Sequence, residues 1–533
     1  MQSLVGTGQL VRFILRRERL RLVIWIAVLA LVPVAVANAF VQLYPLEAER
    51  TQLAATVASS PALVSLLGPV YDSSFGALTA WRVGTIASLL VGLMAILTVI
   101  RNTREEEETG RRELLGSTVL GRHAPLAAAL LVACGAGLVL GGVVAAGLLV
   151  ANLGAPGAAA FGLGFAAVAM LFAGAAAVAA QLTESAGAAR GIAVGFAGLA
   201  FLLRVAGDGG EASGIGWLSW LSPIGWFTRL RPFASERWWL LLPFLGSAVV
   251  LGTVGFVLSS RRDVGAGVLP SRPGPATAGP SLRSALGLGW RIHRPALLGW
   301  SLGLVAVGVV YGSVADSIGD MLDDSPQLAE IFEQLGGAAG ITDAFFATSM
   351  GILALIATAY GIRSVLRSRV EEEGLRAEPI LATATPRLRW AWSHIMFGIL
   401  GPVLMLTAAG FASGATYGAI VGDIGGSAPA VLEAALIQVP AVWFVVGVAV
   451  ALYGLIPRAA SLSWAVLVSS LLLGQLGQIL QFPQWTLNLS PFSHIPRLPS
   501  ADMEIAPLVV LTAIAVAFTA VGLAGFHRRD MTA

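Results

Sequence analysis

Long runs of apolar residues recur along the whole chain, and short polar segments separate them. A bilayer core about 30 Å thick requires roughly 20 apolar residues in a helix that rises about 1.5 Å per residue. About twelve runs reach this length, so the pattern predicts an all-α polytopic membrane protein with about 12 transmembrane helices. The expected spans are residues 22–41, 80–100, 124–152, 157–181, 189–205, 238–259, 296–315, 345–362, 390–419, 429–455, 460–481 and 506–526.

The composition agrees with a chain that has the membrane as its solvent. Charged residues make up 12% of the 533 residues, and hydrophobic residues make up 56%. Soluble domains carry about 25% charged residues, so the composition excludes a soluble enzyme, a disordered chain and a disulfide-rich secreted domain. The single cysteine, Cys134, also excludes a disulfide framework and a zinc site built on cysteines.

The charged loops differ in sign, and this difference predicts the orientation of the chain. Residues 1–21 carry five arginines and one glutamate, and residues 261–294 carry six arginines and one aspartate. Residues 316–343 carry seven acids and no arginine. Because arginine-rich loops stay in the cytoplasm, we expect a plasma-membrane protein with both termini and the central connection inside. The first span is not expected to be a cleaved signal peptide, since no small-residue cleavage site follows it.

The chain carries one pattern of polar residues twice. The matching segments are 104–122 with 369–387, 217–230 with 485–498, and 261–263 with 528–530. In the first pair, eight of 19 positions are identical. Near the start of each copy, the corresponding residues are Arg16 and Arg291, Arg19 and Arg294, and Trp25 and Trp300. Apolar spans resemble one another by composition, but these matches are polar, so they indicate an internal duplication.

A segment rich in glycine, proline and alanine separates the two copies. We therefore expect a first six-span domain at 1–263, a cytoplasmic linker at 264–282 and a second six-span domain at 283–533. Because both halves begin and end on the same side of the membrane, they form parallel rather than inverted repeats.

The duplicated segment between the second and third spans is strongly charged. Its glutamates come first, where a helix N-terminus favours negative charge, and arginines follow four residues later, one helical turn away. We expect the pairs Glu107–Arg111, Glu108–Arg112 and Glu372–Arg376 in a short cytoplasmic helix after the second span of each half. A solvated charged loop is the alternative, but the duplication favours a helix that binds a partner. The candidate partner-binding residues are Arg104, Glu105, Glu106, Glu107, Glu108, Arg111, Arg112 and Glu113, and in the second copy Arg369, Glu371, Glu372, Glu373, Arg376 and Glu378.

No catalytic or metal-binding arrangement is expected in this chain. The five histidines are scattered at span ends, without the spacing of a metal site. Among ionisable residues in the spans, Glu433, Arg82 and Arg204 are expected to reach the lipid headgroups. The sequence contains no lysine, so it cannot contain a P-loop, whose lysine reaches the terminal phosphates of ATP. If ATP drives this protein, a separate subunit binds it.

The pattern Arg-x-Glu-Glu-Glu-x-Gly-Arg-x-Glu-Leu-Leu at 104–115, with its copy at 369–380, resembles that of ABC-2-type exporter permeases. The stretches Ile-Thr-Asp-Ala-Phe-Phe at 341–346 and Arg-Ala-Glu-Pro-Ile-Leu-Ala-Thr at 376–383 are similar to one actinobacterial subgroup. That subgroup consists of fused double permeases that export polyketide antibiotics of the tetronasin type or multiple drugs.

The resemblance implies that each half supplies one six-span transmembrane domain. Two copies of a separate ABC ATP-binding subunit, which carry the ATP and Mg²⁺, would dock beneath. Residues 105–113 and 371–378 would lie on or beside the coupling helices, and an amphipathic or hydrophobic drug, polyketide antibiotic or lipid would pass between the halves. The chain itself would hold no cofactor and bind no nucleic acid. Pro379 replaces Leu114 and Leu375 replaces Gly110, so the two coupling helices are expected to end differently.

Two other function classes fit parts of the pattern. A proton-coupled secondary multidrug antiporter with two parallel six-span halves is the closer alternative, and it requires that Glu433→Gln abolish efflux. A membrane-embedded transferase needs clustered acids or a metal site in a loop, and the sequence offers neither.

Overall fold

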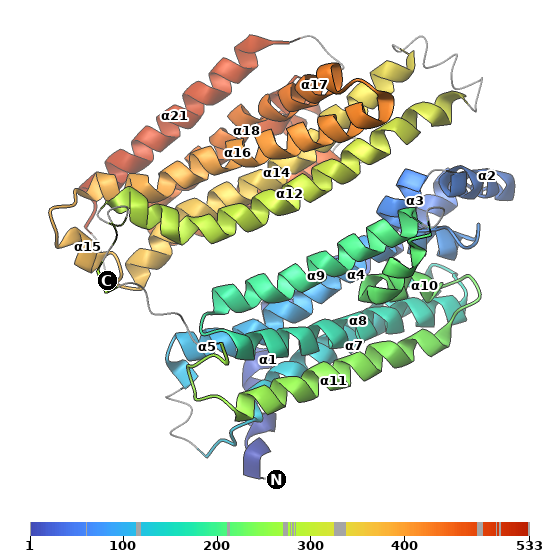
Figure 1. The fold of residues 1–533 in the computed structure, drawn as a ribbon, viewed down its shortest axis with the longest axis horizontal. Coiled ribbons are helices and arrows are strands. Elements are labelled where there is room, and N and C mark those ends of the chain that lie inside the picture. The colour runs from blue at the N-terminus through green and yellow to red at the C-terminus, as the bar shows by residue number, and fades with distance from the viewer. Residues whose placement is uncertain are drawn as a thin grey trace. The chain divides into compact units, whose positions relative to one another are not determined.

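A computed structural model describes residues 2–59, 61–112, 119–210, 214–269, 276–277, 279, 282, 284–323, 337–476, 483–496, 498–499 and 503–530. The chain forms two compact units, Met1–Pro273 and Gly274–Ala533, and the boundary falls inside the expected linker at 264–282. Across the described residues, every regular element is a helix, and twelve helices are long and apolar enough to cross a membrane, six in each unit. The predicted all-α polytopic architecture is confirmed (Figure 1).

The first unit is built on six long helices, and α8 lies among the others. They are α1 (Thr7–Leu43), α4 (Phe75–Arg101), α7 (Ala124–Val150), α8 (Ala155–Leu182), α9 (Ala186–Gly209) and α11 (Leu241–Ser260). Short helices connect them: η1 (Gln2–Leu4), α2 (Glu47–Ser59), α3 (Pro61–Leu67), α5 (Arg104–Glu108), η2 (Gly216–Leu221), α10 (Pro223–Arg229) and η3 (Trp238–Leu240). Helix α8 packs on α4, α7, α9 and α11, and its phenyl groups at Phe161, Phe165 and Phe172 are fully buried.

The second unit repeats this plan with α14, α16 and α18 in its core. Its helices are α12 (Ala285–Asp323), α14 (Gly337–Glu373), α15 (Glu378–Leu381), α16 (Arg387–Val421), α17 (Ile424–Leu436), α18 (Val439–Leu455), η5 (Pro457–Leu462), α19 (Ser463–Leu476), α20 (Gln484–Leu487), η6 (Pro491–His494) and α21 (Ile505–Arg528). Helices α17 and α18 together form one candidate span, Ile424–Leu455. Pro440 lies in the first turn of α18, where its missing N–H costs little, so the span breaks there into two helices.

Glycine allows the closest helix contacts in both units. A side chain on Gly141 of α7 or Gly162 of α8 would collide with the carbonyl oxygen of the other residue. In the second unit, Gly454 of α18 meets the backbone of Gly522 of α21 in the same way. Small residues let helix backbones approach closely, which is how helices associate where lipid removes most of the hydrophobic drive.

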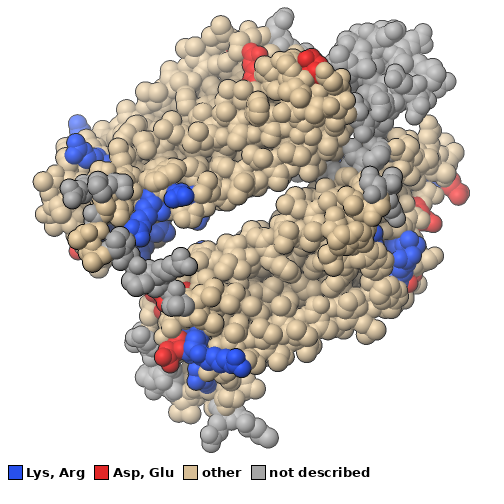
Figure 2. Space-filling model, viewed as in Figure 1, with Lys and Arg blue, Asp and Glu red and all other residues tan. Residues whose placement is uncertain are grey.

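The helices extend beyond the apolar runs at their charged ends, and the expected bounds are wrong there. Helix α1 begins at Thr7 rather than near residue 22, α12 begins at Ala285, and α14 continues to Glu373. Arginine and glutamate are good helix formers, so the helices continue into polar sequence, whereas apolarity marks only the part suited to lipid. On the visible face, the charged side chains lie toward the ends of each unit, and the flanks between them are uncharged (Figure 2).

Candidate functional site

The charged motif of the first unit begins with a break in the helix that forms the second span. Helix α4 ends at Arg101, and α5 starts at Arg104. At the break, the Asn102 amide donates to the carbonyl of Thr98 (2.8 Å) and the Thr103 hydroxyl donates to that of Val99 (2.7 Å). Side chains of this kind compete with the helical backbone and favour helix ends. The expected charged helix is therefore present, as the five-residue α5.

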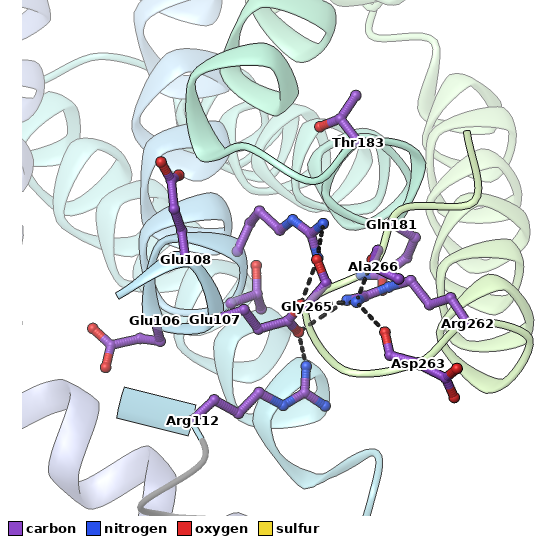
Figure 3. Close-up of polar contacts among 12 residues, drawn as sticks. Glu106, Glu107, Glu108, Arg112, Gln181, Thr183, Arg262, Asp263, Gly265 and Ala266 are labelled. Atoms are coloured by element: carbon purple, nitrogen blue, oxygen red, sulfur yellow. Dashed lines mark hydrogen bonds and ion pairs between the residues drawn. The ribbon is translucent and has the colours of Figure 1, made fainter. Parts of the chain in front are cut away.

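Glu107 lies at the centre of this motif and is buried, with its side chain 1% exposed. Its Oε2 accepts from Nη1 of Arg104 (2.5 Å) and Nη1 of Arg262 (2.8 Å), and its Oε1 accepts from Nη2 of Arg262 (2.9 Å). Arg112 forms an ion pair with the same carboxylate. We call these four residues the Glu107 cluster (Figure 3). It joins α5 to the segment that follows α11.

Backbone carbonyls complete the surroundings of the Glu107 cluster. Arg104 donates to the carbonyl of Gly265 (3.0 Å), and Arg262 donates to that of Ala266 (2.9 Å) and to the side chain of Gln181 (2.7 Å). One carboxylate faces three guanidinium groups, so these carbonyl dipoles offset part of the remaining positive charge. The first residues of the expected linker are thus fixed against the motif.

Burial and mutual repulsion act on the arginines of the cluster. Burial is the largest cause that lowers the pKa of Arg112 to about 10, and the nearby Arg262, Arg104 and Arg122 lower it further. Burial also lowers the pKa of Arg262. With a pKa of about 10, Arg112 remains protonated at neutral pH, so the cluster holds this positive charge and depends on the single carboxylate.

The other glutamates of the motif bind neighbouring helices. Glu106 pairs with Arg17 of α1 (2.7 Å), and Glu105 pairs with Arg190 of α9. Glu108 accepts a hydrogen bond from the backbone N–H of Ala186 (2.8 Å) at the start of α9, where a helix favours negative charge. The solvated-loop alternative is therefore wrong for this copy, although Glu108, Thr109 and Arg111 remain exposed.

The expected pairs four residues apart, Glu107–Arg111 and Glu108–Arg112, do not form. Helix α5 ends at Glu108, and the chain turns at Gly110, whose φ is 72°. The turn places Arg111 beside Glu106 (3.4 Å) and Arg112 beside Glu107, five residues apart in each case. Glu113 lies outside the described residues.

The copy in the second unit is not a separate helix, which corrects the expectation for that half. Residues 369–373 form the last turn of α14, and Arg369 pairs with Glu373 (2.6 Å). The positions of Asn102 and Thr103 are taken here by Arg367 and Ser368. Arginine has a higher helix propensity than asparagine, so α14 continues without a break.

The chain leaves α14 through a left-handed residue at the same point of the repeat. Leu375 has a φ of 56° and corresponds to Gly110. The turn brings Arg376 to Glu371 (2.9 Å) rather than to Glu372, so the third expected pair is also wrong. Glu378 begins α15 and is exposed, as are Glu373, Leu375 and Arg376.

One ion pair recurs in both units and links the charged motif to the arginine pair that closes each copy. Glu372 binds Arg529 (2.8 Å), as Glu107 binds Arg262 (2.8 Å). A second contact also recurs, because Arg122 donates to the carbonyl of Arg262 (2.8 Å) and Arg387 donates to that of Arg529 (3.1 Å). We call Arg262 and Arg529 the closing arginines. They were missing from the predicted site, although their duplication in the sequence was the signal that could have identified them.

Two predicted solitary groups have partners that the sequence did not reveal. Arg204 is fully buried and pairs with Asp208 (2.8 Å), which also pairs with Arg229 (3.0 Å), so Arg204 does not reach the headgroups as expected. His293 of α12 and His394 of α16 are also brought together, with 2.9 Å between Nε2 and Nδ1.

The comparisons with known proteins agree with this architecture. The family described as "Multidrug efflux system permease Rv1217c, C-terminal domain" matches residues 282–527. The chain is also 43% identical over 527 residues to the multidrug efflux system permease protein Rv1217c of Mycobacterium tuberculosis (strain ATCC 25618 / H37Rv). That match covers 99% of this chain and 95% of the relative. The chain therefore belongs to the family of multidrug efflux permeases.

Proposed function

We propose that this chain is the membrane permease of an ATP-binding-cassette exporter, driven by two copies of a separate ATP-binding subunit. It carries amphipathic or hydrophobic compounds, such as drugs, polyketide antibiotics or lipids, out of the cell. The name of the relative supports drug efflux. The energy source and the partner are our inference from the motif and from the absence of lysine in the 533 residues, since a P-loop requires lysine.

The recurring ion pair between each motif and its closing arginine is the observation that carries this proposal. Glu107–Arg262 and Glu372–Arg529 connect the end of the second span to the end of the last span in each unit. The buried Glu107–Arg262 pair resists separation, because removing one partner leaves an uncompensated charge, and the partly buried Glu372–Arg529 pair makes the same connection in the second unit. A force applied to either motif would therefore move the second and sixth spans of its unit together.

The exposed residues of the two motifs form the surface that we propose for docking the ATP-binding subunits. In the first unit they are Glu108, Thr109 and Arg111, and in the second they are Glu373, Leu375, Arg376 and Glu378. The buried members, such as Glu107, transmit the movement and do not touch the partner. The two surfaces differ, because one follows a short separate helix and the other follows the last turn of α14.

The orientation of the chain follows from the same reasoning. In the first unit, the charged motif follows α4 and lies beside Arg17 of α1 and the closing arginine Arg262. In the second unit, it ends α14 and lies beside the closing arginine Arg529. We propose that this end of each unit faces the cytoplasm, because arginine-rich segments stay inside and ATP is supplied there.

Glu433 weighs against the proton-coupled alternative. It lies in the last turns of α17 and is exposed on the surface of the second unit. Carboxylates that relay protons through a membrane protein face the bundle interior or a water-filled cavity. Its exposure supports a position at the lipid or at a protein surface rather than a role in proton transfer.

A transport assay in inverted membrane vesicles separates the two energy sources. Vesicles that contain the permease together with the ATP-binding proteins of its host are loaded with ethidium from outside. We expect ATP to drive uptake, a non-hydrolysable ATP analogue to abolish it, and a protonophore to leave it unchanged. Uptake that stops with the protonophore and persists without ATP hydrolysis would refute the proposal.

The docking surface is tested by reversing exposed charges and leaving the buried cluster intact. Glu373→Arg combined with Glu378→Arg reverses two exposed charges and keeps Arg376, the partner of the buried Glu371. We expect ATP-driven uptake to fall while the protein remains in the membrane. The matched control is Glu504→Arg, since Glu504 is exposed just before α21, at the opposite end of that helix from Arg529. Equal uptake by the reversed variant and wild type would remove these residues from the coupling surface.

A further inference from the structure

The second unit contains a cavity of about 320 Å³ between α12, α14, α15 and α16, beside the charged motif. Ile292, Ile380 and Trp390 form apolar walls, and Arg367, Glu371 and Arg376 are the charged groups that line it. Ligand pockets commonly have volumes from about 300 Å³ upward, with apolar walls and a few polar groups. The cavity has the composition of a binding site.

The first unit fills the corresponding place with larger side chains, so the duplication provides an internal comparison. The register that aligns Arg16 with Arg291 and Trp25 with Trp300 also aligns three positions on one face of the first helix. These are Leu10, Ile14 and Arg17 in α1, and Ala285, Gly289 and Ile292 in α12. Leu10 and Ile14 are buried in the first unit. Ala285 is smaller than Leu10 and leaves space for the cavity, whereas Gly289 lets α12 approach α16, because a side chain there would meet the backbone oxygen of Ser393.

The charges at this place also differ between the units. Arg17 reaches from α1 to Glu106 (2.7 Å) and to Asn102 (2.5 Å), so the first helix neutralises the glutamate. In the second unit, Ile292 replaces Arg17, and Arg367 replaces Asn102. In the second unit, the cations that line the cavity are therefore Arg367 and Arg376, on the side of α14, and the lining residues of α12 are apolar.

The arginines of the cavity can bind a second anion. Glu371 is buried and pairs with both Arg367 (2.6 Å) and Arg376 (2.9 Å), so two guanidinium groups share one carboxylate. The arginine side chains are 43% and 53% exposed. Each guanidinium group has five N–H donors and the two groups share the one carboxylate of Glu371, so donors remain for a second anion.

The wall that α16 contributes suits a ring system. Trp390 and His394 are almost fully buried and lie edge to face, with their ring centroids 5.3 Å apart. The same positions in α7 are Pro125 and Ala129. The second unit therefore has two packed aromatic rings in one wall of the cavity, where the first unit has a proline and an alanine.

We propose that this cavity is a binding site for an amphipathic anion, with its acid group at Arg367 and Arg376 and its apolar part against Ile292 and Trp390. The anion is either a transported compound or an anionic phospholipid of the surrounding membrane, since both present this chemistry. The proposal does not depend on ATP coupling. Because Glu371 and Arg376 belong to the charged motif, occupancy would change the ion pairs of the motif itself.

The test uses the permease alone in phosphatidylcholine nanodiscs, so that it is independent of any ATP-binding subunit. The probe is anilinonaphthalene sulfonate, and its neutral counterpart phenylnaphthylamine has nearly the same rings without the acid group. Binding is followed by energy transfer from tryptophan to the probe. Arg367→Gln with Arg376→Gln should weaken sulfonate binding about tenfold, as expected for the loss of a charge-assisted contact, and leave phenylnaphthylamine binding unchanged.

A second variant fills the cavity without removing its arginines. Ala285→Leu with Ile292→Phe adds apolar bulk to the α12 wall without adding charge, and we expect it to weaken binding of both probes. The matched control is Arg389→Gln, an exposed arginine of α16 that does not line the cavity, and it should bind both probes as wild type does. Sulfonate binding that is unchanged in both double variants would overturn the proposal.

The source of the anion is identified by the lipid of the nanodisc. The comparison replaces phosphatidylcholine with phosphatidylglycerol for wild type and for the cavity-filled variant. If phosphatidylglycerol displaces the sulfonate from wild type, but does not displace the sulfonate that still binds elsewhere on the cavity-filled variant, the natural occupant is a phospholipid. If the lipid has no effect and the arginine variant still loses the probe, the occupant is a soluble or transported anion. Both results support the site, and they assign it to different ligands.

Discussion

Glu107→Gln gives a sharp test of whether the Glu107 cluster stabilises the first unit. The substitution keeps the shape of the side chain but removes the one carboxylate that faces three guanidinium groups. Those side chains are 0% exposed for Arg104, 4% for Arg262 and 16% for Arg112. Removing one partner of a buried ion pair costs about 3–5 kcal/mol. We expect the lower end, about 3 kcal/mol, because the glutamine oxygen still accepts a hydrogen bond.

The corresponding substitution in the second unit, Glu372→Gln, is the matched control. Glu372 serves one closing arginine, Arg529, whose side chain is 16% exposed, together with the hydroxyl of Tyr453. A hydrogen bond to a charged group contributes about 1.5–3 kcal/mol, and we expect a loss near the lower figure. The asymmetry follows from geometry, since the first cluster gathers three buried cations around its carboxylate.

Cys134 provides the assay, because it is the single cysteine of the chain and lies half-buried on α7. A fluorogenic maleimide reports its exposure as the purified permease is heated in lipid nanodiscs. We expect Glu107→Gln to lower the midpoint temperature clearly and Glu372→Gln to change it little, since Cys134 belongs to the first unit. Adding Arg112→Gln to Glu107→Gln removes one of the stranded cations and should recover part of the loss. An unchanged midpoint in Glu107→Gln would refute the view that the cluster stabilises this unit.

Three further substitutions test other parts of the account. Leu375→Gly should raise the free energy of unfolding by about 1 kcal/mol, because a left-handed residue at a helix end favours glycine, and Gly110→Leu should lower it. Denaturation of both variants by sodium dodecyl sulfate measures these free energies. If Leu375→Gly is not more stable than wild type, the left-handed turn at Leu375 is not strained as we infer. Asp208→Asn should lower the free energy of unfolding by about 3 kcal/mol or more, because Arg204 and Arg229 lose a buried counter-ion. The double variant Asp208→Asn with Arg204→Met should lose less stability than the sum of the two single variants. Strict additivity in the same denaturation would show that the two residues are not coupled. Glu433→Gln should transport ethidium at the wild-type rate, and its loss of transport would favour the proton-coupled alternative.

The apolar pattern predicted the twelve spans because lipid imposes a simple rule on every residue of a span. It failed at the charged ends, where α1, α12 and α14 continue past the apolar runs. Helix length there depends on propensity and on packing within the unit. The break between α4 and α5 depends on Asn102 and Thr103, and hydropathy does not register such side-chain competition with the backbone.

The charged helix predicted after the second span is confirmed in the first unit as α5, but the ion pairs predicted within the motif are wrong. The expected spacing of four residues assumed that the helix continues, whereas Gly110 and Leu375 turn the chain back at the same point of each copy. The partners Arg262 and Arg529 come from the other end of each unit, and a local spacing argument cannot reach them. In the sequence, both arginines recur at the end of each copy, and the structure shows that each pairs with a glutamate of the charged motif.

Cross-linking from the exposed motif tests the central proposal most directly. A photoreactive amino acid is placed at Thr109 or Leu375 in the permease within its native membranes, with Val150, exposed at the end of α7 away from the motif, as the control position. We predict that both motif positions cross-link to a protein that carries a P-loop lysine and hydrolyses ATP, and that Val150 does not. Motif positions that label only lipid, in membranes where ATP-driven ethidium transport continues, would contradict the account.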